Sequence, residues 1–174
     1  MPATTYNKLK TKSRQVWIRS SQLTTWGLNV AEVPYPTDEG ANELAAYLDV
    51  QPEAILCSDQ DWEYIYPKLE QLPIFLDLYR TKPLSDQAKR VVGCFIFQAL
   101  EYHLKDAGEP TLVLDSLKML HADYRIHQPE FEYWSCLDCD DSELGPEETH
   151  FAITKYVRPF LGAIDGIQIA WRTL

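Results

Sequence analysis

One segment, Ser85–Ala107, limits most strongly what this chain of 174 residues can fold into. Ser85 is a preferred helix N-cap, Asp86 would lie in the positive first turn, and Lys105 would lie in the negative last turn. Gly108 follows as the expected left-handed terminator of the helix. The middle of the segment is apolar almost all round, so other helices must surround it. The sequence therefore predicts a central helix whose buried residues are Val91, Val92, Phe95, Ile96 and Ala99.

Shorter amphipathic segments supply the surrounding helices. Apolar residues recur at helical spacing between Ala41 and Leu48, behind Thr37 as the expected N-cap. Proline suits the first turn of a helix, and it marks the expected starts of further short helices at Pro52, Pro67, Pro73, Pro110, Pro129 and Pro146. The last of these helices should bury Ala152, Ile153, Tyr156, Val157 and Phe160. These patterns predict a mainly helical body.

Strand-like patterns occur near both ends of the chain. Val16 and Ile18 alternate with polar residues, residues 23–33 are rich in Thr, Trp and Val, and residues 166–174 alternate in the same way. We therefore predict a mainly α fold of the α+β type, in which N-terminal strands and a C-terminal strand form a small sheet. No linker divides the chain, so residues 1–174 are expected to form a single globular domain, with residues 1–14 as a candidate flexible basic arm.

The charges are distributed unevenly. The formal net charge is −10, but the first 31 residues contain five bases and no acid, which leaves 11 bases against 26 acids in residues 32–174. Such a body repels phosphate backbones, so direct nucleic-acid binding is disfavoured and a basic protein is the expected partner. No apolar run has the length of a membrane span or the form of a secretion signal. We expect a cytoplasmic protein with reduced cysteines and no membrane association.

A Cys-x-x-Cys pair, Cys136 and Cys139, lies within a run of acidic residues. A structural zinc site would need two further ligands, for which the candidates are His121, His127 and His150, with His127 and His150 favoured, but none of them belongs to a second paired motif. Redox activity is disfavoured because neighbouring carboxylates destabilise a thiolate. The sequence therefore favours ordinary reduced cysteines and no cofactor. The alternative is a metal-binding enzyme or regulator that uses the two cysteines and a histidine.

Two segments interleave acids with aromatic residues: residues 61–66, Asp-Trp-Glu-Tyr-Ile-Tyr, and residues 130–134, Glu-Phe-Glu-Tyr-Trp. Because alternate residues cannot all be buried, we expect some of them to share an exposed face. Acids steer a basic partner and large rings anchor it. The expected partner-binding residues are Glu130, Glu132, Tyr133, Trp134, Asp138, Asp140, Asp141 and Glu143.

Common catalytic signatures are missing: the chain has no GxGxxG, Walker P-loop, HExxH or GxSxG sequence. The absence of these signatures makes an enzyme less probable, although an enzyme does not require one of them. The sequence therefore favours a non-enzymatic, acidic protein-binding protein. Such a chain could be an immunity protein or antitoxin that neutralises a basic, nuclease-type toxin.

Overall fold

The computed structural model describes residues 6–10, 15–19, 35–56, 61–137 and 151–162. The chain divides into two compact units, residues 1–35 and residues 36–174. In the first unit, strands β1 (Tyr6–Lys10) and β2 (Gln15–Arg19) pair in antiparallel fashion, with Tyr6 opposite Arg19. Whether residues 1–174 form one domain, and whether residues 1–14 form a flexible arm, stay predictions.

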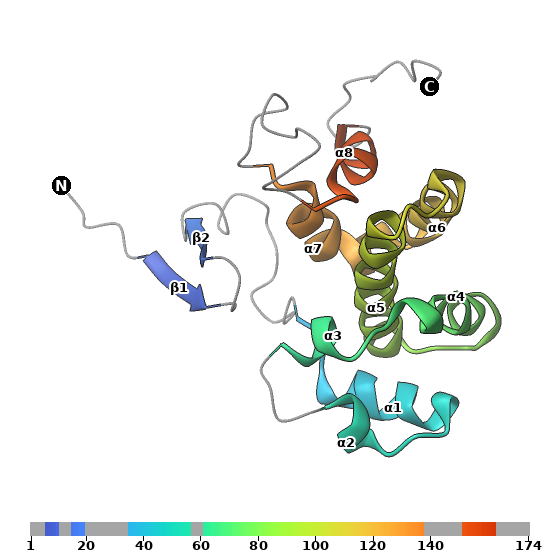
Figure 1. Ribbon diagram of the computed structural model, residues 1–174. Coiled ribbons are helices and arrows are strands. Elements are labelled where there is room, and N and C mark those ends of the chain that lie inside the picture. The colour runs from blue at the N-terminus through green and yellow to red at the C-terminus, as the bar shows by residue number, and fades with distance from the viewer. Residues whose placement is uncertain (1–5, 11–14, 20–34, 57–60, 138–150, 163–174) are drawn as a thin grey trace. The chain divides into compact units, whose positions relative to one another are not determined.

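In the described residues of the second unit all regular secondary structure is helical (Figure 1). Its elements are α1 (Asp38–Leu48), α2 (Pro52–Ile55), α3 (Trp62–Ile65), the 3₁₀ turn η1 (Leu69–Gln71), α4 (Leu72–Thr81), α5 (Asp86–Lys105), α6 (Pro110–Ala122), α7 (Tyr124–Ser135) and α8 (Thr154–Gly162). Helix α5 contacts α1, α3, α4, α6 and α7, while α8 packs on α6 and α7. The predicted helical body around one central helix is confirmed.

The predicted small sheet is wrong. Strands β1 and β2 pair only with each other among the described residues and belong to the first unit, and the described residues of the second unit contain no strand. Helices already surround α5, so its apolar surface needs no sheet to cover it. A short alternation of apolar and polar residues shows only that the backbone can extend locally, not what it packs against. The predicted strands at 23–33 and 166–174 lie outside the described residues.

The central helix has the predicted start and core. Ser85 caps it, because its Oγ accepts a hydrogen bond from the Ala88 amide at 3.1 Å. The five residues predicted for its centre are fully buried. Rings from other elements pack on Phe95: its ring centroid lies 5.2 Å from those of Tyr66 and Phe75.

The predicted end of the central helix is wrong in one detail. Ala107, not Gly108, adopts the left-handed conformation, with φ of 57°. The Gly108 amide donates to the His103 carbonyl at 2.7 Å, as in a Schellman motif. A Cβ at Gly108 would collide with the His103 ring. The glycine at 108 thus lies under the His103 ring, whereas the left-handed residue precedes it.

Helix α7 begins earlier than predicted. It starts at Tyr124, and Pro129 lies inside it rather than in its first turn. The proline removes one backbone donor, but burial of the inner face of the helix outweighs that loss. In the region of α8, Ile153, Val157 and Phe160 are buried as predicted, whereas Ala152 and Tyr156 are only half-buried. Helix α8 starts at Thr154, and residues 151–153, which the helix predicted from Pro146 would include, are not helical. None of the described helices has the length and apolarity needed to cross a membrane.

Candidate functional site

Helix α7 carries three polar side chains into the interior. His127, Glu130 and Trp134 are spaced three and four residues apart, so they lie along one side of the helix, and all three are buried. Each keeps one buried polar atom without a hydrogen-bond partner among the described residues: Nδ1 of His127, Oε2 of Glu130 and Nε1 of Trp134. Unpaired polar atoms in a protein interior are costly. His127, Glu130 and Trp134 therefore mark the candidate functional site.

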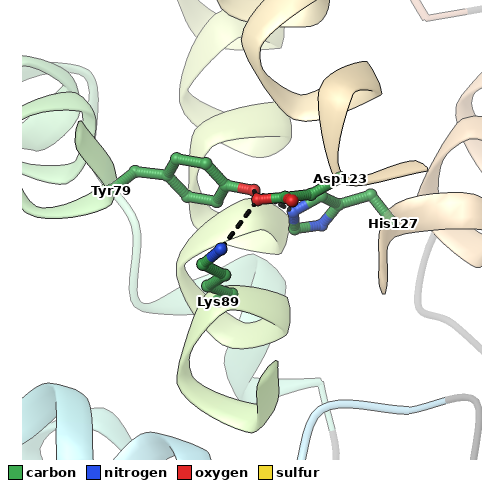
Figure 2. Close-up of polar contacts among 4 residues, drawn as sticks. All are labelled: Tyr79, Lys89, Asp123 and His127. Atoms are coloured by element: carbon green, nitrogen blue, oxygen red, sulfur yellow. Dashed lines mark hydrogen bonds and ion pairs between the residues drawn. The ribbon is translucent and has the colours of Figure 1, made fainter. Parts of the chain in front are cut away.

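The first polar cluster surrounds His127 (Figure 2). The Tyr79 hydroxyl from α4 lies 2.8 Å from both His127 Nε2 and Asp123 Oδ2. Asp123, between α6 and α7, also forms an ion pair of 2.9 Å with Lys89 of α5. Since the Asp123 carboxylate is ionised, it accepts a hydrogen bond from the Tyr79 hydroxyl. The Tyr79 oxygen must then accept its other hydrogen bond from Nε2–H of His127. The chain of hydrogen bonds thus leaves His127 Nδ1 as a bare acceptor.

His127, Tyr79 and Asp123 all have pKa values shifted away from neutral pH. Burial lowers the pKa of His127 to about 3, so the imidazole is neutral. Burial, followed by the hydrogen bond to Asp123, raises the pKa of Tyr79. The hydrogen bonds from Lys89 and Tyr79 lower the pKa of Asp123. The arrangement therefore serves to join α4, α5 and the start of α7 rather than to supply a general base.

Gly93 makes room for His127 on the central helix. A Cβ at this position would lie 2.5 Å from His127 Nδ1 and closer still to Cε1. Glycine inside a helix costs roughly 0.5–1 kcal/mol relative to alanine, so its presence indicates a packing requirement. We did not single out Gly93 from the sequence, although a glycine in the middle of the strongest helix is the kind of signal that could have identified it.

The second polar cluster surrounds Glu130. The Cys94 thiol of α5 donates a hydrogen bond to Glu130 Oε1 at 3.0 Å. Glu130 as a whole residue is only 6% exposed. Burial raises the pKa of Glu130 to about 7, against the lowering effects of the Cys94 hydrogen bond and the nearby Arg90 charge. Burial, followed by the Glu130 charge, raises the pKa of Cys94 well above its usual value. Cys94 is therefore an unreactive thiol.

Helix α3 brings the two acid-aromatic segments of the sequence together at Glu130. The Tyr64 ring stacks on Tyr133 with centroids 5.6 Å apart, and it meets Trp134 edge-on at 6.3 Å. Glu63 is half-buried, and burial raises its pKa. We call Glu63, Tyr64, Glu130, Tyr133 and Trp134 the α3–α7 cluster.

The structure separates the predicted partner-binding residues. Glu130 and Trp134 are interior, whereas Tyr133 is half-buried and Glu132 is exposed, where it accepts a hydrogen bond from Gln128 at 2.8 Å. Helical spacing explains the difference, because residues 130 and 134 share the side of α7 that faces the core and residue 132 does not. The remaining four, Asp138, Asp140, Asp141 and Glu143, lie outside the described residues.

The candidate metal ligands are also separated. Cys136 is the half-buried, left-handed C-cap of α7, and its Sγ lies 3.8 Å from Thr154 Oγ1. His127 lies more than two helical turns before Cys136 along α7 and is hydrogen-bonded to Tyr79. Cys139 and His150 lie outside the described residues. Within the part of the chain that the structure describes, no three His, Cys, Asp or Glu side chains are grouped so that they could hold a metal ion.

Helices α1 and α2, with the turn between them, carry a set of exposed acids. Residues 36–56 contain five acids and no base. Four of the acids, Asp38, Glu39, Asp49 and Glu53, are exposed, and so is Tyr47, at 39%. We call these five residues the α1–α2 surface. The sequence did not indicate it because its acids are spread over two helices and a turn rather than gathered in a run.

The fifth acid of this segment, Glu43, has a structural role. Its Oε1 accepts from the Ser85 amide at 3.0 Å and its Oε2 from the Ser85 hydroxyl at 2.6 Å. Glu43 thus connects α1 to the N-cap of the central helix.

Comparison of the chain with protein-family models, with curated proteins and with solved structures gave no match.

Proposed function

We propose that this protein is a non-enzymatic binding protein that captures a basic protein partner. The observation that carries the proposal is the α1–α2 surface, which combines four exposed carboxylates with an exposed tyrosine and has no compensating base in its segment. A basic nuclease-type toxin is the partner class that this charge fits, so the protein would act as an immunity protein or antitoxin. The acids at 138–143 would extend the negative charge offered to the same partner.

The interior polar groups support binding over catalysis. His127 and Tyr79 have pKa values displaced away from neutrality in opposite directions, and their polar atoms are bonded to each other. A general acid or base must reach a substrate proton directly or through one water, and His127 and Tyr79 are buried.

Charge and aromatic side chains would have different roles in capture. Exposed charges attract an oppositely charged protein over distances of about 10 Å at moderate salt, and they chiefly raise the association rate. An aromatic anchor such as Tyr47 chiefly slows dissociation. The two contributions can be measured separately.

The test begins with affinity capture from the native host, followed by binding kinetics with the recovered protein at two salt concentrations. The variant is Asp38→Asn/Glu39→Gln/Asp49→Asn/Glu53→Gln. The control, Glu70→Gln/Asp77→Asn/Asp106→Asn/Glu109→Gln, removes the same charge from four exposed residues elsewhere. We expect association of the first variant to slow by about tenfold or more at low salt, with little change in dissociation. An acidic partner, or equal slowing in both variants, would contradict the proposal.

A further inference from the structure

The α3–α7 cluster has an unusual combination of groups for an interior site. It contains two carboxyl groups that repel each other, from Glu63 and Glu130, together with the packed rings of Tyr64, Tyr133 and Trp134. Glu130 is more than nine-tenths buried, and its Oε2 finds no hydrogen-bond partner among the described residues. Trp134 Nε1 is buried and unpaired in the same way. A buried acceptor that the described residues leave unpaired is available to a donor from a ligand.

We propose that the α3–α7 cluster binds an arginine side chain that the basic partner inserts. The guanidinium group donates to the carboxylates of Glu63 and Glu130, and its plane stacks on the Tyr64 ring. Arginine fits because its planar fork of donors matches carboxylates and its weakly hydrated face stacks on aromatic rings. This inference rests on the proposed function, since it names the side chain by which the basic partner would be recognised.

The charges around Glu130 are consistent with a site that is filled only in the complex. The charge of Glu130 interacts with Glu63 and Tyr64 of α3 and with Arg90 of α5, and Cys94 of α5 donates a hydrogen bond to it. Arg90 lowers the Glu130 pKa, but burial outweighs that effect and leaves the carboxyl group largely protonated below neutral pH. A cation placed between the carboxyl groups of Glu63 and Glu130 would favour the ionised form of both.

In this proposal the arginine enters at the stacked pair of tyrosines, Tyr64 and Tyr133. Both are half-buried, so each ring is partly open to solvent. Tyr64 belongs to a helix of four residues. Rotation of its ring about two side-chain torsions is a smaller change than movement of a long helix, and an inserted arginine would replace the stacking that the ring loses.

Binding should be linked to pH. Since the cation favours ionised Glu130, binding releases a proton whenever the free carboxyl group is protonated. Affinity for arginine should therefore rise as the pH increases from about 5 to about 8, through the pKa of Glu130 near 7. Replacing Glu130 with glutamine should remove most of this dependence.

The experiment titrates the full chain with N-acetyl-arginine methylamide and follows amide and indole resonances by NMR. N-acetyl-citrulline methylamide, which has nearly the same shape and no charge, is the control ligand. The variants are Glu130→Gln and Glu63→Gln, and Glu70→Gln is the control for loss of an exposed charge. Glu130→Gln should fold, because it replaces a largely neutral carboxyl group with a neutral amide of the same shape.

We expect the arginine probe to shift resonances of residues 62–65 and 130–134, including the Trp134 indole N–H. Glu130→Gln should weaken binding about tenfold, the scale of one charge-assisted hydrogen bond, and Glu70→Gln should leave it unchanged. Shifts confined to the α1–α2 surface, equal binding by Glu130→Gln, or equal binding of citrulline would overturn the proposal. If these occur while a basic partner is still captured, the proposed function stands and the arginine site does not. If the probe binds at the cluster but no basic partner is captured from the host, the arginine site stands and the proposed function does not.

Discussion

His127 lies directly against the backbone of Gly93, so close that the imidazole occupies the space a Cβ would take. The contact joins the buried side of α7 to the central helix, and it places a neutral histidine between them.

Gly93→Ala should destabilise the protein by about 1–3 kcal/mol, the usual cost of overpacking, because the added methyl group displaces the His127 ring. The better helix propensity of alanine offsets only part of this cost. Urea unfolding measures the change. In a His127→Ala background the same substitution should be neutral or stabilising, since the ring is gone. An equal cost in both backgrounds would show that the contact with His127 is not its cause.

Tyr79→Phe should cost about 1–3 kcal/mol, because it leaves the buried Nε2–H of His127 without an acceptor and removes one donor to Asp123. Tyr47→Phe removes the same hydroxyl from an exposed ring and should stay within about 0.5 kcal/mol. Thermal and urea unfolding of the two variants provide the comparison. Similar small losses in both would mean that the His127 donor finds another partner.

Glu130→Gln should become more stable than the wild type as the pH rises. The folded-state pKa of Glu130, near 7, lies above its ordinary value of 4.5, so the protonated carboxyl group contributes stability that is complete below pH 4.5 and is lost as the pH rises through 7. Glutamine does not titrate. The free energy of unfolding of the variant relative to wild type should therefore increase between about pH 4.5 and 7, by roughly 2–3 kcal/mol, and stay level above.

Denaturant melts at pH 5, 6, 7 and 8 test this linkage, with Glu132→Gln as the matched change on the exposed side of α7. A stability difference between Glu130→Gln and wild type that does not change with pH would rule out the raised pKa of Glu130.

Phe95→Ala should destabilise by about 3–5 kcal/mol, as expected for truncation of a fully buried phenylalanine. The loss removes ring contacts with Trp62 and Tyr66, from the α3 segment, and with Phe75, from α4. Ile74→Ala, at a side chain 50% exposed, is the control and should cost much less. A loss below about 1 kcal/mol at Phe95 would be inconsistent with its central position.

The sequence was informative where the signal is local. The N-caps Thr37 and Ser85 and the burial of Phe95 follow from capping preferences and from the apolar pattern of one helix. The small sheet was wrongly predicted because alternation over a few residues carries no information about long-range packing. Gly108 and Pro129 were assigned their commonest roles, whereas neighbouring side chains and burial decided their actual ones.

The site was harder to predict than the fold. The alternation of acids and rings in residues 130–134 suggested a shared exposed face, although helical spacing from His127 already placed residues 130, 131 and 134 on one side. The hydrogen bond between Tyr79 and Asp123 joins residues 44 positions apart. No pattern within one segment can indicate such a pair, because it depends on how α4 and α7 meet on α5.

The link between Glu43 and Ser85 has a consequence for the dynamics of the body. Glu43 provides both acceptors for the residue that caps the central helix, so local opening of α1 also releases the first turn of α5. The two segments should therefore exchange their amide hydrogens with solvent as one cooperative unit. A ligand bound to α1 would therefore slow amide hydrogen exchange in the first turn of α5 without contacting α5. Exchange in the central helix would thus report binding at the α1–α2 surface.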